Sequence, residues 1–178
     1  MSILKIAHMG HPVLRRRARA LEPSDLRNPI VQKLIDDMIE TMHEYHGVGL
    51  AAPQVHESVR IFVAMFDDEP DEESQTVALI NPEIIPVGSA TEEGWEGCLS
   101  IPDIRGMVPR HVDIAVRALD RTGRPFDIRL KDFPARVAQH ETDHLDGVLF
   151  FDRMRSMETL TFMEEFSKYW AKEEKEEA

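Results

Sequence analysis

The HETDH segment at residues 140–144 constrains the fold more than any other feature of this chain. It lies within residues 134–146, which predict a helix that ends at the following glycine. Residues four apart lie on one face of a helix, so the rings of His140 and His144 point toward the same place. An H-E-x-x-H pattern so placed predicts a metal-binding helix, with Glu141 near a bound water as a base that is not itself a ligand.

A catalytic site of this kind needs a third protein ligand and an open position for water. Cys98, the only cysteine among the 178 residues, is one candidate because thiolate binds zinc and iron strongly. In zincin-type peptidases the third ligand follows the helix, but the position that would hold histidine is Phe150 here. The remaining candidates are the carboxylates of Glu158, Glu164 and Glu165. The residues alone leave open a cysteine or a downstream glutamate, and a free cysteine is also commonly just a small buried side chain.

The formal net charge of −12 is concentrated in two places, residues 67–73 and residues 158–178. The rest of the chain is nearly balanced, which argues against a nucleic-acid-binding protein, since such a protein would carry a basic face. Both acidic runs are expected to be solvated surface. No apolar run approaches the ~18 residues of a membrane span, and the N-terminus lacks the apolar core of a signal peptide. The arginine patch at residues 15–19 is not followed by a transit-peptide composition, so a cytoplasmic protein is expected.

The pattern of apolar residues predicts an α+β fold with small antiparallel or mixed sheets packed around the central metal-binding helix. An N-terminal helix is expected at residues 29–46, with Asn28 as its N-cap and Pro29 in its first turn. A C-terminal helix is expected at about residues 156–172. The expected strands are residues 60–65, 76–80 and 83–87 and a hairpin of residues 113–119 and 126–130. Residues 1–178 are expected to form a single catalytic domain that ends in an acidic tail.

Residues 47–54, GVGLAAPQ, form a third segment of interest. Taken alone they predict a helix end followed by a loop whose small residues allow a ligand to approach the backbone. The side-chain amide of Gln54 is a donor of the kind that faces a developing oxyanion. This segment does not fit a phosphate-binding loop, because it lacks the lysine and the order of strand before helix.

Together, GVGLAAPQ (47–54), EGCLS (96–100) and HETDH (140–144) resemble the three motifs of the peptide deformylase family, in the family's order. The flanking stretches HPVLRRRA, LINPEI and SIPDIRGMVPR resemble the family too, so the resemblance covers roughly residues 3–155. One motif position departs, Thr142, where an apolar residue is usual. The resemblance implies a hydrolase that removes the N-formyl group from the initiator methionine of nascent chains and releases formate.

The resemblance also implies the parts of the site. The metal ligands it implies are Cys98, His140 and His144. They would hold one divalent ion, Fe²⁺ in the cell, with Zn²⁺, Ni²⁺ or Co²⁺ in preparations. Water activated by the ion would be the nucleophile, with Glu141 as general base and then general acid. The side-chain N–H of Gln54 and the backbone N–H of Leu99 would hold the oxyanion.

Substrate-binding residues are expected from position and from the resemblance. They are Val48, Gly49, Glu96, Arg105, Phe133 and Val137. Val137 and Phe133, one and two turns before the first histidine, would line an apolar pocket for methionine. The backbone of residues 48–49 would pair with an extended peptide, and Arg105 would lie near the peptide's carbonyl groups. Glu96 would not contact the metal itself but would fix the loop or a nearby arginine beside the ligands.

Two alternatives stay open on the residues alone, a zincin-type metallopeptidase and a non-catalytic relative with a closed structural metal site. The expected partners are N-formyl-methionyl nascent peptides, with neither DNA nor a membrane. Transient association with the ribosome fits the function, although the acidic tail offers no obvious rRNA contact. The expected assembly is a monomer or a weak oligomer.

Overall fold

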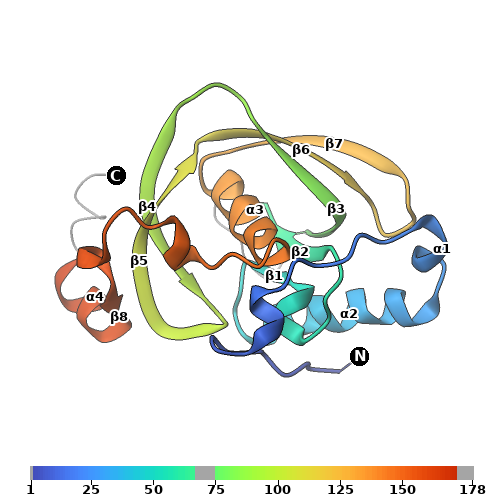
Figure 1. The fold of residues 1–178 in the computed structure, drawn as a ribbon, viewed down its shortest axis with the longest axis horizontal. Helices are drawn as coiled ribbons and strands as arrows, with labels where there is room; N and C mark the ends of the chain where they lie inside the picture. The colour runs from blue at the N-terminus through green and yellow to red at the C-terminus, as the bar shows by residue number, and fades with distance from the viewer. Residues whose placement is uncertain (1, 67–74, 172–178) are drawn as a thin grey trace.

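The computed structural model describes residues 2–66 and 75–171. The acidic run at residues 67–73 and the end of the acidic tail lie outside the described residues. The described chain forms two antiparallel sheets with one helix, α3 (Asp132–Leu145), between them (Figure 1). This arrangement confirms the expected α+β class with sheets around a central helix.

The larger sheet has five strands in the order β1-β2-β3-β6-β7, and every neighbouring pair is antiparallel. Its strands are β1 (Gly49–Ala51), β2 (Ile61–Met65), β3 (Thr76–Pro86), β6 (Asp113–Leu119) and β7 (Pro125–Lys131). The second strand and the β6–β7 hairpin are confirmed within a residue of their expected bounds. The two strands expected at 76–80 and 83–87 form one continuous strand, because a register shift between Ile80 and Glu83 accommodates Pro82, which cannot donate a hydrogen bond.

The smaller sheet contains β4 (Thr91–Cys98), β5 (Ile101–His111) and β8 (Thr161–Phe162). The β4–β5 hairpin was not predicted. Its register pairs Glu96 with Gly106 and Gly97 with Arg105, so neighbouring residues on each strand face opposite sides. The inner side holds the buried Glu96 and faces α3, whereas the outer side includes Trp95 and Arg105.

The N-terminal helix α2 (Pro29–Glu44) begins where the sequence predicts. The Asn28 side chain accepts a hydrogen bond from the backbone N–H of Ile30, and Pro29 occupies the first turn. The helix ends two residues before its expected end. The remaining helical segments are η1 (Pro12–Arg15), α1 (Pro23–Leu26), η2 (Ala52–Val55), η3 (Phe150–Arg153), η4 (Met157–Thr159) and α4 (Met163–Tyr169).

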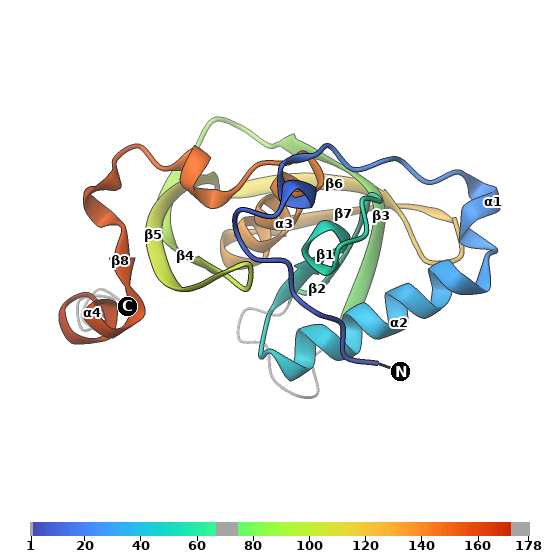
Figure 2. The same cartoon turned by 60° about the horizontal axis from the view of Figure 1, so that its bottom comes forward.

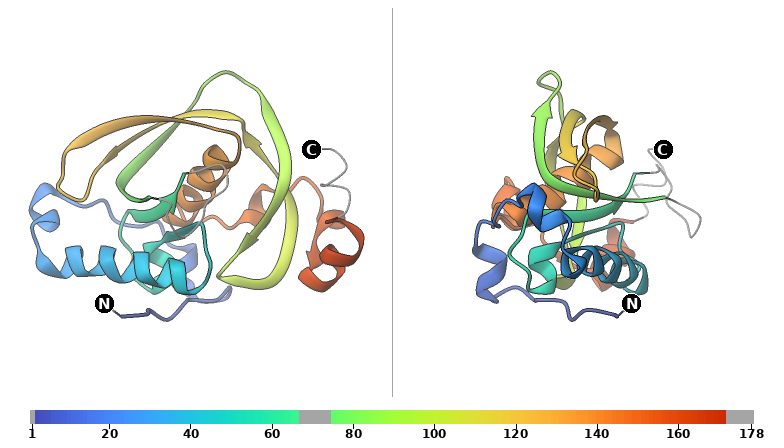
Figure 3. Two further views of the ribbon diagram at one scale, coloured as in Figure 1. Left: turned by 180° about the vertical axis from the view of Figure 1, so that it is seen from behind. Right: turned by 90° about the vertical axis from the view of Figure 1, so that its right-hand side faces the viewer.

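The expected C-terminal helix at 156–172 is wrong. A 3-10 turn, the short strand β8 and the short helix α4 take its place. The reason is tertiary, because Thr161 and Phe162 pair with the open edge of β5, and the Thr159 hydroxyl accepts the backbone N–H of Met107. Strand pairing at the edge outweighs the local helical periodicity of the segment. Figures 2 and 3 show α4 at the end of the molecule opposite α1 and α2, beyond the β4–β5 hairpin.

Three clusters of buried apolar side chains form the core. One lies between α2 and the larger sheet, one between that sheet and α3, and one beneath η1, η3 and β5. The helix α3 therefore has core packing along its length, which fixes the direction of its polar side chains. Among the described helices, none has the length and apolar character needed to cross a bilayer.

Candidate active site

The helix α3 and the end of β4 bring three potential metal ligands together. Ligand atoms of Cys98, His140 and His144 all lie within 4.8 Å of one another, the only such group among the described residues. The Cys98 Sγ lies 3.2 Å from Nε2 of His144, and the two imidazole rings are 5.0 Å apart at 74°. One sulfur and two imidazole nitrogens form a donor set that suits a divalent transition metal and leaves a position open.

The two histidines have different electrostatic surroundings. Burial lowers the pKa of His144 well below its usual value, and its ring stays neutral, the form that binds a metal. For His140, burial strongly disfavours the charge, but hydrogen bonds with Cys98 and Glu96 and the charges of these two groups together outweigh it and raise the pKa of His140 well above its usual value. In the described chain the Nδ1 atom of His144 has no hydrogen-bond partner.

The downstream glutamates do not reach these ligands. Glu164 and Glu165 lie on α4 and pair with Lys168, and Glu158 shares a hydrogen bond with Ser156. Phe150 is fully buried in the core near the His140 ring. The alternative of a downstream carboxylate ligand is therefore wrong, and the zincin-type reading that depends on it is not supported.

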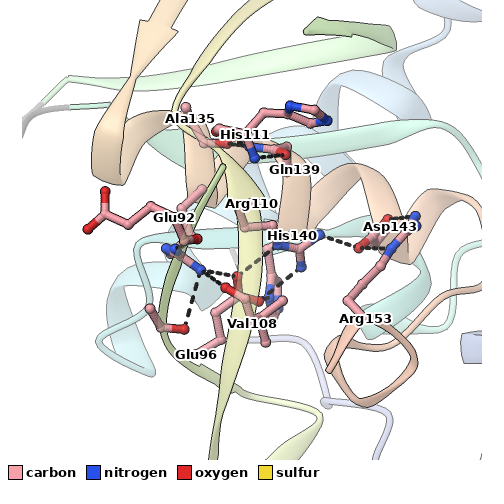
Figure 4. A network of polar contacts seen from close by, with 12 residues as sticks. Glu92, Glu96, Val108, Arg110, His111, Ala135, Gln139, His140, Asp143 and Arg153 are labelled. Carbon is pink, nitrogen blue, oxygen red and sulfur yellow. Dashed lines mark hydrogen bonds and ion pairs between the residues drawn. The ribbon is translucent and has the colours of Figure 1, made fainter. Parts of the chain in front are cut away.

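Glu96 holds His140 from behind. Its carboxylate is 4% exposed and lies 2.8 Å from Nδ1 of His140. Figure 4 shows the contact as a dashed line between the two side chains. It also accepts two hydrogen bonds from Arg110, at 2.8 and 3.0 Å, and one from Arg136 at 3.0 Å. Burial opposes ionisation, yet Arg110 and His140 hold the pKa of Glu96 well below its usual value. The carboxylate thus orients the histidine ring so that its other nitrogen faces the ligand position.

The network extends from Glu96 through Arg110 to the far side of α3. Arg110 donates to Asp143 at 2.6 Å, and Asp143 also accepts two hydrogen bonds from Arg153 (Figure 4). Arg110 is only 5% exposed, and Glu96 and Asp143 raise its pKa despite burial. Asp143 therefore ties α3 to β5 and η3.

Arg136 closes the network on the other side. Its guanidinium donates to the backbone carbonyls of Glu92, Gly94 and Val108, which join both strands of the hairpin to α3. Arg110, Arg136 and Arg153 were not among the residues predicted from the sequence. Arg136 lies one helical turn before the first histidine, a spacing that could have drawn attention to it.

Glu141 is 4% exposed, and its Oε2 has no hydrogen-bond partner in the described chain. Burial raises its pKa to about 7. A Cβ at position 49 would lie 2.5 Å from Glu141 Oε1, so only glycine lets β1 approach this carboxylate. The strand β1 and the helix α3 therefore enclose Glu141.

Gln54 is oriented by its own loop. Its Oε1 accepts the backbone N–H of Ala51 at 2.8 Å, which directs Nε2 toward Cys98 Sγ at 3.5 Å and the Ser100 hydroxyl at 3.3 Å. Its side chain is 1% exposed. Leu99 is half-buried between Cys98 and Ser100 and packs against the core beside α2. The structure thus brings the predicted oxyanion donors to the same edge as the cysteine.

The predicted substrate residues lie in two places, on α3 and beside β1 near the candidate ligands, and on the outer side of the β4–β5 hairpin. Val137 is buried in the core cluster between the larger sheet and α3, and Phe133 on the same helix is 40% exposed. Val48 precedes Gly49 in β1 and packs against the core. Arg105, by contrast, lies on the outer side of the hairpin and contacts Met163 and Phe166, not the ligands.

Comparisons with known proteins agree with this geometry. The polypeptide deformylase family model matches residues 3–160. The chain is 45% identical over 164 residues to peptide deformylase 2 of Nostoc sp., covering 89% of this chain and 90% of the relative. It is 46% identical over 151 residues to the peptide deformylase of Dictyoglomus thermophilum, covering 85% and 92%.

Solved structures give the same result. A class I type b peptide deformylase from Acinetobacter baumannii superposes with a TM-score of 0.81 at 38% identity, covering 86% of this chain and 100% of the other. The peptide deformylase from Thermotoga maritima superposes with a TM-score of 0.80 at 41% identity, covering 88% and 100%. A structure of the Acinetobacter baumannii enzyme with Met-Ala-Ser bound superposes with a TM-score of 0.79 at 36% identity, covering 86% and 100%.

Proposed function

The chain belongs to the polypeptide deformylase family, enzymes that remove the N-formyl group from nascent peptides, and on that premise we propose how its residues perform the hydrolysis. Cys98, His140 and His144 would hold one divalent ion. When bound, this ion polarises the formyl carbonyl and lowers the pKa of water toward ~7. The observation that carries the proposal is the cluster of three ligand atoms within 4.8 Å beside the buried Glu141 carboxylate.

Glu141 is the general base in this proposal. Its pKa of about 7, raised by burial, suits a group that takes a proton at neutral pH and then returns it. Glu141 takes a proton from the attacking water as the C–O bond forms at the formyl carbon. It then gives the proton to the methionine nitrogen as the C–N bond breaks, releasing formate and a free N-terminus.

The developing oxyanion needs donors that are already in place. The Nε2 of Gln54 is fixed by the Oε1 bond to Ala51 and is directed toward the cysteine. We assign it one oxyanion hydrogen bond and the backbone N–H of Leu99 another. Each well-placed donor stabilises such a transition state by about 3 kcal/mol.

Substrate binding follows from the walls of the same site. The methionine side chain would lie against Val137 and Phe133 on α3, and the peptide backbone would pair with residues 48–49 beside Glu141. Glu96 contributes indirectly, because it fixes the ring of His140. Of the ions this donor set accepts, we expect Fe²⁺ in the cell, with Zn²⁺, Ni²⁺ or Co²⁺ in preparations. We expect the protein to act in the bacterial cytoplasm on chains leaving the ribosome.

Formate release from formyl-Met-Ala-Ser by anaerobically purified protein tests the proposal. The wild type should release formate, and Glu141→Ala should not. Cys98→Ala should lose bound metal, measured by elemental analysis, whereas Ser156→Ala, at an exposed position whose hydroxyl hydrogen-bonds with Glu158, should keep both metal and activity. A folded, metal-loaded wild type that releases no formate would contradict the proposal.

A further inference from the structure

The chain continues beyond the region that matches the family, and this continuation covers the outer side of the β4–β5 hairpin. The family match ends at residue 160. Immediately afterwards, β8 pairs with β5 at Ile104 and Arg105. The following helix, α4, then lies beside β5 (Figure 2).

An aromatic cluster attaches α4 to the hairpin. Trp95 on β4 packs edge-on against Phe166, with ring centroids 4.9 Å apart, and lies 5.5 Å from Trp170. Phe166 is buried. These aromatic contacts fix the position of α4 on the hairpin, although the helix is only seven residues long.

The same helix holds the side chain of Arg105. The Nε of Arg105 donates to the Met163 sulfur at 3.1 Å, and the guanidinium carbon lies 5.2 Å from the centre of the Phe166 ring. No carboxylate of the described residues pairs with Arg105. A thioether and an aromatic face fix the guanidinium without neutralising it, so its terminal N–H groups and its charge remain available.

The guanidinium of Arg105 lies near the strand end that carries Cys98. Arg105 lies directly across the hairpin from Gly97, the residue before Cys98. A Cβ at position 97 would lie 3.8 Å from the guanidinium carbon of Arg105, so the arginine side chain extends over this glycine. A peptide leaving the metal site along β4 would pass an arginine whose position is set by α4.

We propose that residues 161–170 form a substrate-positioning strap. In it, Met163 and Phe166 fix the side chain of Arg105, which the family resemblance leads us to expect near the peptide's carbonyl groups, so that it can bind oxygen acceptors beyond the formyl-methionine residue. Met163 and Phe166 are positioning residues, since they act through Arg105. This inference rests on the proposed deformylase function, and it concerns a segment that the family match does not include. It gives a role to a half-buried arginine that has only neutral partners among the described residues, in a chain with a net charge of −12.

The experiment compares two substrates with the metal-loaded protein, formyl-Met amide, which has no oxygen acceptor beyond the methionine residue, and formyl-Met-Ala-Ser. The test variant is Phe166→Leu with Met163→Leu, which keeps apolar bulk against Trp95 but removes the ring face and the sulfur. Tyr169→Ala is the matched control, because this side chain is on the same helix and is 67% exposed. The same pair of substitutions is also made in an Arg105→Ala background.

We expect the ratio of KM for the longer peptide to KM for the shorter one to rise about three- to fivefold in the double variant, with little change in kcat. Arg105→Ala should raise it about tenfold, Tyr169→Ala should not change it, and the double substitution should add nothing once Arg105 is absent. An unchanged ratio in the double variant, or an equal rise in the Arg105→Ala background, overturns the proposal. If the double variant unfolds, Met163→Leu alone, at a 38% exposed position, makes the same comparison.

A second measurement separates this proposal from the proposed function. Both tryptophans of the chain, Trp95 and Trp170, belong to the cluster, so their fluorescence reports on the strap. Titration with the product peptide Met-Ala-Ser should give a Kd that Phe166→Leu with Met163→Leu raises about three- to fivefold. Absence of formate release by the wild type would overturn the deformylase mechanism, whereas an unchanged Kd in this titration would overturn the strap.

Discussion

The two sides of the β4–β5 hairpin hold an arginine in opposite ways. On the inner side, Arg110 is 5% exposed and pairs with Glu96 and Asp143 at 2.6 to 3.0 Å. On the outer side, Arg105 is held by Met163 and Phe166, with no carboxylate partner among the described residues. A compensated buried charge fixes structure, whereas an uncompensated charge at the surface remains free to bind a ligand.

This difference predicts unequal consequences. Loss of an inner partner leaves a buried charge without compensation, which is costly. Loss of an outer partner removes only a contact, because water solvates what remains. Inner substitutions should therefore change folding, metal affinity or chemistry, and outer substitutions should change only affinity for the peptide.

The largest effect is expected for Glu141→Gln on the inner side. Removal of the base should lower kcat about 10³-fold. The unfolding temperature should not fall, because a neutral amide replaces a buried carboxylate whose Oε2 has no partner in the described chain. Steady-state formate release and thermal unfolding of the metal-loaded protein provide the two values. A variant that keeps a tenth of the wild-type kcat would show that another group is the base.

The next largest effect is a difference in stability between variants of Arg110 and Arg105. Arg110→Met should lower the free energy of unfolding by about 3 kcal/mol, because it leaves Glu96 and Asp143 buried with fewer partners. Arg105→Met should lower it by less than about 0.5 kcal/mol. Urea denaturation of both variants measures the difference. Equal losses would remove the distinction between the two sides.

A smaller effect is expected in the metal affinity of Glu96→Gln. The amide has no charge, keeps only one accepting oxygen and places its NH2 group against a donor, so His140 is held less firmly and the affinity for Zn²⁺ or Ni²⁺ should fall about 10- to 100-fold. Competition with a chromogenic chelator measures it. The control is Glu93→Gln on the outer side of the same strand, where the carboxylate pairs with the exposed Arg155. If both variants bind metal equally well, Glu96 has no role in holding the histidine.

The smallest effect on function is expected when the chain is truncated after Leu160. The loss of β8 and α4 should raise KM for formyl-Met-Ala-Ser three- to fivefold, as in the Phe166 and Met163 variant, and leave metal content unchanged. The free energy of unfolding should fall by about 2 kcal/mol, mainly from the lost burial of Phe166. Kinetics and urea denaturation measure these changes. Loss of metal from the truncated protein would mean that the two sides are not independent.

The sequence predicted well where local signals agree with the fold. The helix α2 has its N-cap Asn28 and a proline in its first turn, and the β6–β7 hairpin surrounds a turn sequence, residues 120–125. The helix α3 carries its two histidines four residues apart, so their meeting point was fixed by helical geometry alone.

The sequence predicted poorly where pairing with another strand, and not local propensity, decides the structure. Residues 91–98 are rich in glutamate and glycine and have weak strand propensity, and they become β4 only because β5 pairs with them. Residues 156–172 have helical periodicity, yet the open edge of β5 takes Thr161 and Phe162 into a strand. Both errors concern one sheet, in which β4 and β5 form a hairpin and Thr161 of β8 pairs with Arg105, 56 residues before it.

By itself, the sequence determined the local geometry of the candidate site. The spacing of His140 and His144, the thiol of Cys98 and the small residues before Gln54 are properties of short segments, because helices and loops have fixed periods and limited dihedral angles. Only the tertiary structure decided which charges are buried together and which remain free. Arg110, Arg136 and Arg105 look alike in the sequence, and they differ because the packing of β4 and β5 between α3 and α4 excludes water on one side of the hairpin and not on the other.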